Sequence, residues 1–227
     1  MLKALTQTSF HGPRGPVVLA ILDGIGLSDA VDGNAVRTAR TPHLDGLWSR
    51  ALATTLKAHG TAVGLPSDED MGNSEVGHNA IGCGRVFAQG AKLVAEAIAS
   101  GALFRGTAWR EIVGNVVAHG TTLHLIGLFS DGNVHSHLDH LRALLTQARR
   151  EGVKQARLHI LLDGRDVGET SALDYVDPFE TFLAELNAGG VDYRIASGGG
   201  RMVVTMDRYQ ADWSMVQRGW DTHVRGR

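Results

Sequence analysis

Four short apolar stretches along the chain each run into a polar turn, and they set the expected architecture. Stretches of this length that contain β-branched residues and end in such turns are typical of buried β-strands. The first three reach an Asp-Gly pair and the fourth ends in three glycines. We therefore expect strands within these segments: PVVLAILDG (16–24), TLHLIGLFSDG (122–132), ARLHILLDGRD (156–166) and VDYRIASGGG (191–200).

Amphipathic helices are expected between and after these strands. Apolar residues recur at helical spacing in 136–152, where Ser136 can cap the helix and Gly152 can end it. The segment 171–190 also reads as a helix, in which Pro178 is tolerable only at a helix start or a kink. Further helical patterns cover 91–103 and 211–224.

The alternation of strands and helices predicts an α/β fold with a mainly parallel sheet. Such sheets bind ligands at the carboxyl ends of their strands, so the polar turns are where chemistry is expected. Near residues 88–90 a polar, glycine-rich stretch gives way to a helix-like one. We therefore expect one domain at 1–88 and another at 89–227.

Composition narrows the classes of function. The net charge is -2, with 22 basic and 24 acidic residues, so no global field favours nucleic acid or an anionic membrane. No apolar run reaches the roughly 20 residues of a spanning helix, and residues 1–15 read as a loose leader. A single cysteine, Cys83, excludes an internal disulfide framework and suits a reducing cytosol.

The stretch EDMGNSEVGHNAIG (69–82) places Ser74 between glycines, four residues after the last of the acidic residues Asp68, Glu69 and Asp70. A serine in such a setting is most often an ordinary turn or helix cap. His78, four residues on, can face Ser74 across one helical turn. Asp23 at the end of the first apolar run likewise fits either a common turn or a ligand site.

The sequence HSHLDH presents a possible metal cluster, because His135, His137, Asp139 and His140 follow the pattern H-x-H-x-D-H. Imidazoles and a carboxylate at this spacing can bind zinc, and the spacing resembles the metallo-β-lactamase-fold hydrolases. Against this, the last two residues fall inside a strongly periodic helix. A zinc-dependent hydrolase is the alternative from another class of enzyme.

Arginines follow the third and fourth apolar runs, at Arg165, Arg201 and Arg208. A guanidinium presents a planar fork of donors that suits carboxylate and phosphate oxygens. Gathered at neighbouring strand ends, these arginines would form an anion pocket. The simpler alternative is that Arg165 and Arg208 pair with their neighbours Asp166 and Asp207.

Five segments, in this order, resemble the cofactor-independent (2,3-bisphosphoglycerate-independent) phosphoglycerate mutases of the alkaline phosphatase superfamily. The resemblance runs from about Pro16 to the end of the chain. The last segment is similar to the branch that includes the plant and trypanosomatid enzymes. The segments are LDGIG, DMGNSEVGHNAIGCGR, GLFSDGNVHSHLDHL, LLDGRD and IASGGGRMVVTMDRYQADW.

The resemblance implies an isomerase of glycolysis and gluconeogenesis that interconverts 3-phosphoglycerate and 2-phosphoglycerate through a phosphoserine. Ser74 takes the role of the nucleophile and Asp23 that of a ligand of the same metal ion. Two divalent ions are implied, Mn²⁺ first and Co²⁺ or Mg²⁺ as alternatives, with no 2,3-bisphosphoglycerate. By residue match, the resemblance implies that the substrate is bound by His135, Arg165, Asp166, Arg201 and Arg208.

The resemblance also implies a cytoplasmic, mostly monomeric enzyme, built as a metal-binding phosphatase-like domain with an inserted transferase domain. Family members are about twice as long as this chain, and their second half carries the remaining metal ligands. Residues 1–88 would then be part of the phosphatase-like domain, and 89–227 an incomplete transferase domain. We expect a fragment, a truncated product or half of a split enzyme, inactive alone. A non-catalytic phosphoglycerate-binding remnant is a further alternative.

Overall fold

The structure is a computed structural model that describes residues 6–205 and 210–227. It separates into two compact units, 1–55 and 56–227. The predicted division at residue 88 is a different boundary and stays a prediction. The first unit contains two short helices, α1 (Ala35–Thr38) and α2 (Pro42–Arg50). The second begins with η1 (Gly60–Val63), α3 (Ser74–Cys83), α4 (Gly90–Ala99), α5 (Ala102–Arg105) and α6 (Thr107–His119).

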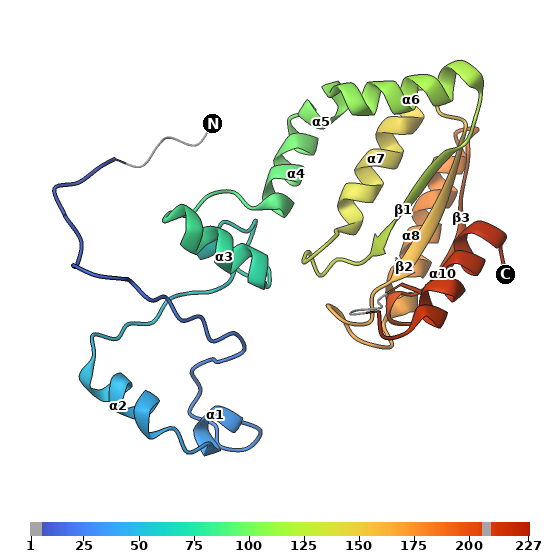
Figure 1. Cartoon of the computed structure of the whole chain (residues 1–227). Helices are drawn as coiled ribbons and strands as arrows, with labels where there is room; N and C mark the ends of the chain where they lie inside the picture. Colours follow the sequence, from blue (N-terminus) through green and yellow to red (C-terminus); the bar gives the residue numbers. More distant parts are fainter. Residues whose placement is uncertain (1–5, 206–209) are drawn as a thin grey trace. The chain divides into compact units, whose positions relative to one another are not determined.

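A parallel three-stranded sheet forms the centre of the second unit (Figure 1). Its strands stand in the order β1-β2-β3, and the predicted β-α-β unit is confirmed. The glycines at the end of β3 allow close packing, because a Cβ on Gly198 would lie 2.8 Å from Ile160 Cγ1. The elements are β1 (Leu123–Phe129), α7 (Leu138–Arg150), β2 (Gln155–Leu162), α8 (Ala172–Asn187), β3 (Asp192–Gly200), α9 (Arg201–Val204) and α10 (Trp213–Arg225).

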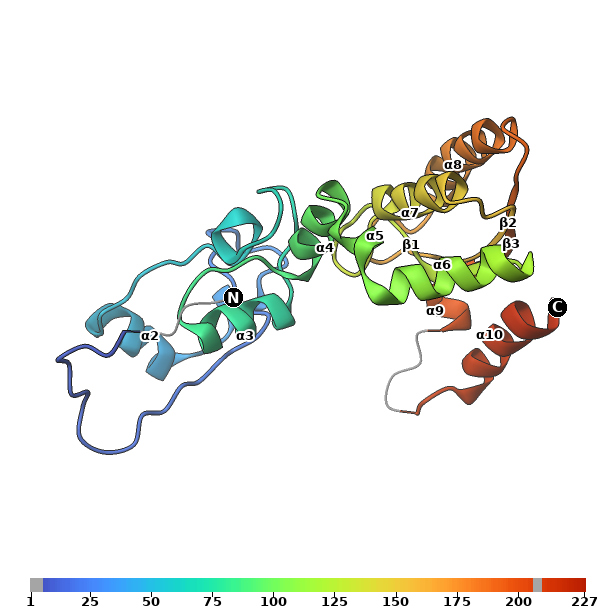
Figure 2. The same ribbon diagram turned by 90° about the horizontal axis from the view of Figure 1, so that it is seen from above.

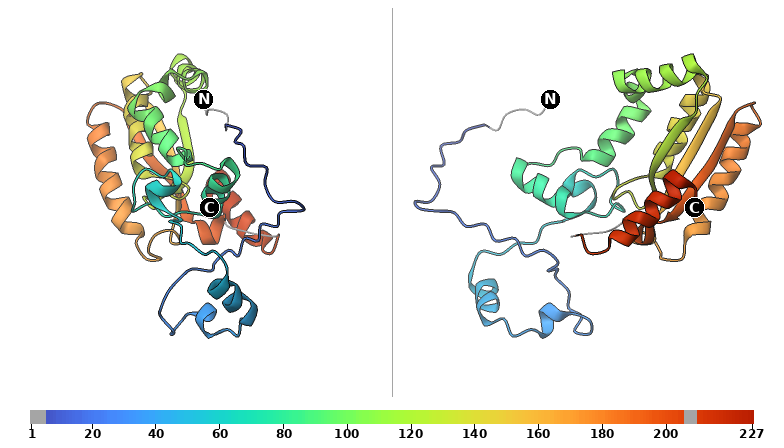
Figure 3. Two further views of the ribbon diagram at one scale, coloured as in Figure 1. Left: turned by 90° about the vertical axis from the view of Figure 1, so that its left-hand side faces the viewer. Right: turned by 45° about the vertical axis from the view of Figure 1, so that its right-hand side comes forward.

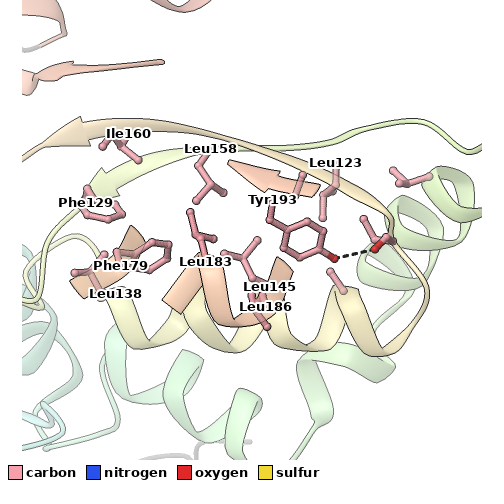
Figure 4. Close-up of a cluster of buried hydrophobic side chains, with 14 of the residues drawn as sticks. Leu123, Phe129, Leu138, Leu145, Leu158, Ile160, Phe179, Leu183, Leu186 and Tyr193 are labelled. Atoms are coloured by element: carbon pink, nitrogen blue, oxygen red, sulfur yellow. Dashed lines mark hydrogen bonds between the residues drawn. The ribbon is translucent and has the colours of Figure 1, made fainter. Parts of the chain in front are cut away.

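Helices α7 and α8 lie on one side of the sheet, and α9 and α10 lie on the other (Figures 2 and 3). The strands alternate, so that every second side chain faces α7 and α8. Phe129 packs edge-on against Phe179 at 4.9 Å between ring centroids. Tyr193 is buried among the same residues, and its hydroxyl donates to the Val153 carbonyl at 3.0 Å (Figure 4). This core fixes the carboxyl ends of the strands.

Two details of the helices differ from expectation. The cap of α7 is His137 rather than Ser136, because its Nδ1 accepts the Asp139 amide at 3.1 Å and the helix begins at Leu138. Of the two placements expected for Pro178, the helix start is excluded, because Pro178 lies inside α8. A proline there removes one helical hydrogen bond, and the buried side chains Phe179 and Leu183 hold the helix on the sheet.

The first predicted strand is wrong for this structure. Residues 16–24 have no regular secondary structure, and Val17, Val18 and Leu19 are exposed by 67–86%. A strand needs a neighbour to accept its backbone hydrogen bonds, and local pattern alone cannot supply one. The apolar pattern therefore remains exposed in the first unit.

Two further properties of the described residues concern the length of the helices and the single cysteine. None of the helices in 6–205 and 210–227 is long and apolar enough to cross a membrane. Cys83, at the end of α3, is a free thiol of intermediate exposure. Burial of that degree is ordinary for a packed cysteine.

Candidate functional site

The turns after the three parallel strands meet at one edge of the sheet. Parallel strands end at a common edge, so residues following β1, β2 and β3 lie near one another. An open cleft of roughly 850 Å³ lies here. Its walls include Asp163, Arg165, Asp166, Tyr175 and Met202. The position agrees with the expectation that chemistry sits in the polar turns.

Asp163 holds the backbone of the turn after β2 in place. Its side chain is fully buried, and Oδ1 accepts the backbone amides of Arg165 at 3.1 Å and Asp166 at 3.0 Å. Burial raises the pKa of the Asp163 carboxyl, whereas hydrogen bonds from Ser130 and from these two amides lower it. The charge of Arg201 lowers it further, and the resulting pKa is below its ordinary value. Asp163 is therefore a buried anion that fixes the turn after β2.

Arg201 lies between two carboxylates at the start of α9. Its Nη2 is 2.7 Å from Asp163 Oδ1 and 2.9 Å from Asp166 Oδ2, and its side chain is only 5% exposed. These contacts are ion pairs without hydrogen-bond alignment, and Nε of Arg201 has no hydrogen-bond partner within 6–205 and 210–227. Arg201 does not itself line the cleft, whereas Gly200 and Met202 on either side of it do.

The other predicted substrate residues are more exposed. Asp166 also faces His135, with 3.9 Å between Oδ2 and Nε2, and the His135 side chain is 60% exposed. Arg165 is exposed in the cleft and forms no ion pair with the described residues, so the expected pairing with Asp166 does not occur. Asp166 pairs with Arg201 instead. Arg208 lies outside the described residues.

Breaking the Asp163–Arg201 pair is expected to be costly. We predict that Asp163→Asn lowers the free energy of unfolding at pH 7 by about 3–5 kcal/mol, because it leaves a buried guanidinium short of charge. The depressed folded-state pKa of Asp163 stabilises the fold above about pH 4, and this contribution is lost as the pH falls through that pKa. Urea unfolding at several pH values measures both effects.

The matched control for this prediction is Asp192→Asn. Asp192 pairs with Arg157 and Arg194, and its side chain is 34% exposed, so it resembles Asp163 in charge but not in burial. Its replacement should cost about 1 kcal/mol or less. Equal losses for the two variants would contradict the role assigned to Asp163.

Ser74 is the first residue of α3, and Asn73 caps the helix by accepting the Val76 amide at 2.9 Å. The expected approach of His78 is confirmed: its Nδ1 lies 3.2 Å from Ser74 Oγ and 2.7 Å from the Ser74 carbonyl. A carbonyl only accepts, so this nitrogen carries the hydrogen. His78 therefore cannot take the Ser74 proton at Nδ1 in this arrangement.

The predicted metal ligands are Asp23 and Ser74, which lie in different compact units. Asp23 is exposed, and its Oδ1 accepts the Gly24 amide at 3.0 Å. Carboxylate and hydroxyl oxygens are donors that hard divalent ions such as Mn²⁺ and Mg²⁺ accept. The donor chemistry therefore fits, while two side chains are too few for two ions.

The alternative zinc site lacks a preformed ligand set. Among the described residues, no three His, Cys, Asp or Glu side chains stand close enough to hold a metal ion. His137 Nδ1 is already committed to the Asp139 amide as the cap of α7. His140 sits within α7, where burial first and then the charge of His137 lower its pKa.

Sequence reasoning missed three residues of this edge. Ser130 is 1% exposed, and its Oγ accepts the Gly132 amide at 3.1 Å while its carbonyl accepts the Leu138 amide at 2.9 Å. Asp163 was visible only as a turn residue after a strand. Tyr175 forms part of the cleft wall from α8. The sequence offered one signal for Ser130 and Asp163, which is that each is a polar residue at the end of an apolar strand.

Comparison with known proteins decides the family. A family model described as "BPG-independent PGAM N-terminus" matches residues 94–227. The chain belongs to this family. It is 61% identical over 212 residues to a Leptospira interrogans protein named "Probable 2,3-bisphosphoglycerate-independent phosphoglycerate mutase", and 54% identical over 217 residues to the Zea mays enzyme of that name.

A solved structure is similar as well. Leishmania mexicana phosphoglycerate mutase, crystallised at low cobalt concentration, matches 91% of this chain with a TM-score of 0.82 and 50% identity. The matches cover 92% and 94% of this chain for the Leptospira and maize relatives. They cover only 38–39% of those relatives and of the Leishmania chain. The chain thus spans well under half the length of the relatives.

Proposed function

We propose that this chain supplies the nucleophile and much of the substrate pocket of a phosphoglycerate mutase that interconverts 3-phosphoglycerate and 2-phosphoglycerate. The observation that carries the proposal is the match of over nine-tenths of the chain, at 50–61% identity, to proteins of that name. The strand-end cluster agrees with it, because Asp163 and Asp166 line an open cleft and pair with Arg201, whose Nε is a buried donor. No 2,3-bisphosphoglycerate is needed.

Ser74 is proposed as the nucleophile. Its Oγ attacks phosphorus, the bond from phosphorus to the O3 oxygen of the substrate breaks, and phosphoserine and glycerate result. The O2 oxygen of glycerate then attacks the same phosphorus, and the bond to Ser74 Oγ breaks. The position at the first turn of α3 favours the negative charge of the phosphoryl group.

Activation of Ser74 requires a group other than His78, whose Nδ1 donates to a carbonyl. A divalent ion held by Asp23 and Ser74, with further ligands from the remainder of the enzyme, would lower the hydroxyl pKa and offset phosphoryl charge. The Leishmania relative was crystallised with cobalt, which agrees with a divalent ion. We propose manganese as the usual one, with cobalt or magnesium as substitutes.

Glycerate must stay bound while it reorients between the two transfers. We propose that Arg165 and Arg201 hold its anionic groups, that Asp166 accepts from a hydroxyl, and that His135 completes the grip. Arg165 has no competing ion pair in the part of the chain described, and Arg201 has a free buried Nε. The Arg201–Asp166 contact would loosen as ligand replaces it.

The remaining part of the enzyme is proposed to come from the region that the relatives have beyond this match, as a continuation of the polypeptide or as a second chain. Residues 17–22 would form a strand beside strands of that region, which would bury their exposed apolar side chains. We propose a cytoplasmic enzyme that acts as a monomer once complete, within glycolysis and gluconeogenesis.

The 227-residue chain alone is predicted to bind 3-phosphoglycerate weakly and to turn none of it over. Without the missing ligands Ser74 keeps an ordinary hydroxyl pKa, but the cleft after β2 lies wholly within the chain. We expect millimolar affinity, roughly 4 kcal/mol. An NMR titration and a coupled enolase assay with Mn²⁺ measure these two properties.

Shifts in the titration should centre on 163–169 and 130–135. Arg165→Ala should weaken binding, while the control Arg194→Ala, an exposed arginine paired to Asp192 near the amino end of β3, should not. Robust turnover by the chain alone would overturn the argument that it is incomplete. Equal weakening by both substitutions would overturn the assigned pocket.

A further inference from the structure

A short hydrogen bond joins two segments that lie far apart in the sequence. Asn133 Nδ2 donates to Asp70 Oδ1 at 2.6 Å, across 63 positions. Asp70 precedes the Ser74 helix, and Asn133 lies in the turn after β1. A second side-chain hydrogen bond across the predicted boundary at residue 88 runs from Gln89 Nε2 to the Val63 carbonyl at 3.0 Å, but Asn133–Asp70 joins two side chains.

Asp70 is held firmly from its own side. Its Oδ2 accepts the Ser67 amide at 2.7 Å and the Ser67 hydroxyl at 2.9 Å, and its carbonyl accepts the Gly60 amide at 3.1 Å. Burial raises the pKa of Asp70, but the hydrogen bonds from Asn133 and Ser67 outweigh it and leave the pKa below its ordinary value. The acceptor for Asn133 is thus a charged carboxylate, which makes a stronger bond than a neutral group.

The backbone between Asp70 and Ser74 has little freedom. A Cβ on Gly72 would lie 2.2 Å from the Ala58 carbonyl oxygen, so Gly72 packs directly against that backbone. Asn73 caps α3 through the Val76 amide. Asp70 is thus joined to Ser74 by three residues, two of which, Gly72 and Asn73, are fixed by close contacts of their own.

Asn133 is equally well placed in its own turn. Its φ of 54° lies in the left-handed region, which asparagine tolerates better than most residues. The preceding Gly132 packs closely on Asp166, since a Cβ there would be 3.2 Å from the Asp166 Cβ. His135 follows two residues later. The turn that holds Asn133 is thus part of the proposed glycerate pocket.

We propose that Asp70 and Asn133 are a positioning pair that holds the Ser74 segment against the glycerate pocket. The inference deepens the proposed function and rests on it for its kinetic consequence. The pair touches neither phosphorus nor metal in the proposed scheme, so its loss should impair transfer rather than ligand binding. Misplacement of a nucleophile by about 1 Å can cost on the order of 100-fold in rate.

Three sets of variants separate the contact from other effects. Asn133→Gly keeps the left-handed backbone and removes the amide. Asp70→Asn and Asn133→Asp each disturb the pair, the second by placing two carboxylates together. The double variant Asp70→Asn/Asn133→Asp restores an amide facing a carboxylate. Gln147→Ala is the control, because it breaks an exposed hydrogen bond of 2.7 Å to Glu151 on α7.

The first measurement uses the 227-residue chain. In its amide NMR spectrum, Asn133→Gly should shift resonances of residues 67–76, and the double variant should return them toward their original positions. Gln147→Ala should leave them unmoved. Unchanged 67–76 resonances in Asn133→Gly would overturn the proposed contact, and this readout does not depend on catalysis.

The second measurement uses a chimera in which this chain replaces the matching region of the Leptospira interrogans relative. We expect Asn133→Gly and Asn133→Asp to lower kcat roughly 10- to 100-fold with little change in KM, and the double variant to recover part of the loss. An unchanged kcat, or a loss confined to KM, would overturn the positioning role. An inactive unsubstituted chimera would instead count against the proposed function. The NMR spectra of the 227-residue chain would still test the contact between Asp70 and Asn133.

Discussion

Ser74→Ala is expected to abolish phosphoglycerate mutase activity in the chimera defined above while leaving the fold intact. Loss of a nucleophile that forms a covalent intermediate typically costs on the order of 10⁴–10⁶-fold in rate. The fold should survive because Ser74 is exposed and the cap of α3 is Asn73. A coupled enolase assay gives the rate, and circular dichroism with urea unfolding checks the fold.

Two controls sharpen this expectation. Ser100→Ala removes another exposed serine, one that donates to the Glu96 carbonyl at the end of α4, and should leave activity unchanged. His78→Gln tests the inference that His78 is no general base, and a small effect is expected. Substantial activity in Ser74→Ala, or a loss in His78→Gln as large as in Ser74→Ala, would contradict the proposed mechanism.

Removal of divalent metal should be the other large effect. The chimera is expected to lose activity roughly 1,000-fold in a chelator and to regain it with Mn²⁺, because the ion activates the hydroxyl and offsets phosphoryl charge. Asp23→Ala should raise the manganese concentration needed for half-maximal activity. Asp32→Ala, which removes an exposed acid from the same compact unit, should not.

Metal content measured beside activity makes the test independent of turnover. Asp23→Ala protein should retain less manganese after gel filtration than Asp32→Ala protein. Full activity after exhaustive chelation, with no metal detected, would reject a metal role for Asp23 and Ser74.

The sheet of the second unit was predictable from local pattern. Strands β1 and β2 bury alternate apolar residues, β3 buries Tyr193, all three end in turn residues, and α7 carries apolar residues at helical spacing. These signals are local, since each depends on neighbours within a few positions. The parallel arrangement then followed from the alternation of helix and strand.

The features that sequence did not reveal depend on distant partners. Residues 16–24 have the pattern of a strand, but they have no regular secondary structure and their apolar residues are exposed. The ion pairs of Arg201 with Asp163 and Asp166 join residues 35 to 38 positions apart, and no local pattern indicates them. The bond from Asn133 to Asp70 spans 63 positions and leaves no periodic trace. Such contacts are set by tertiary packing, which propensity cannot report.

Mass spectrometry of the quenched chimera tests whether Ser74 carries the phosphoryl group. The chimera is mixed with 3-phosphoglycerate and Mn²⁺, quenched in acid within one turnover and digested. We expect one added phosphoryl group on the peptide that contains Ser74, and none in Ser74→Ala or in protein treated with chelator. An active chimera with phosphate on a histidine, or with no phosphorylated peptide at any quench time, would contradict it.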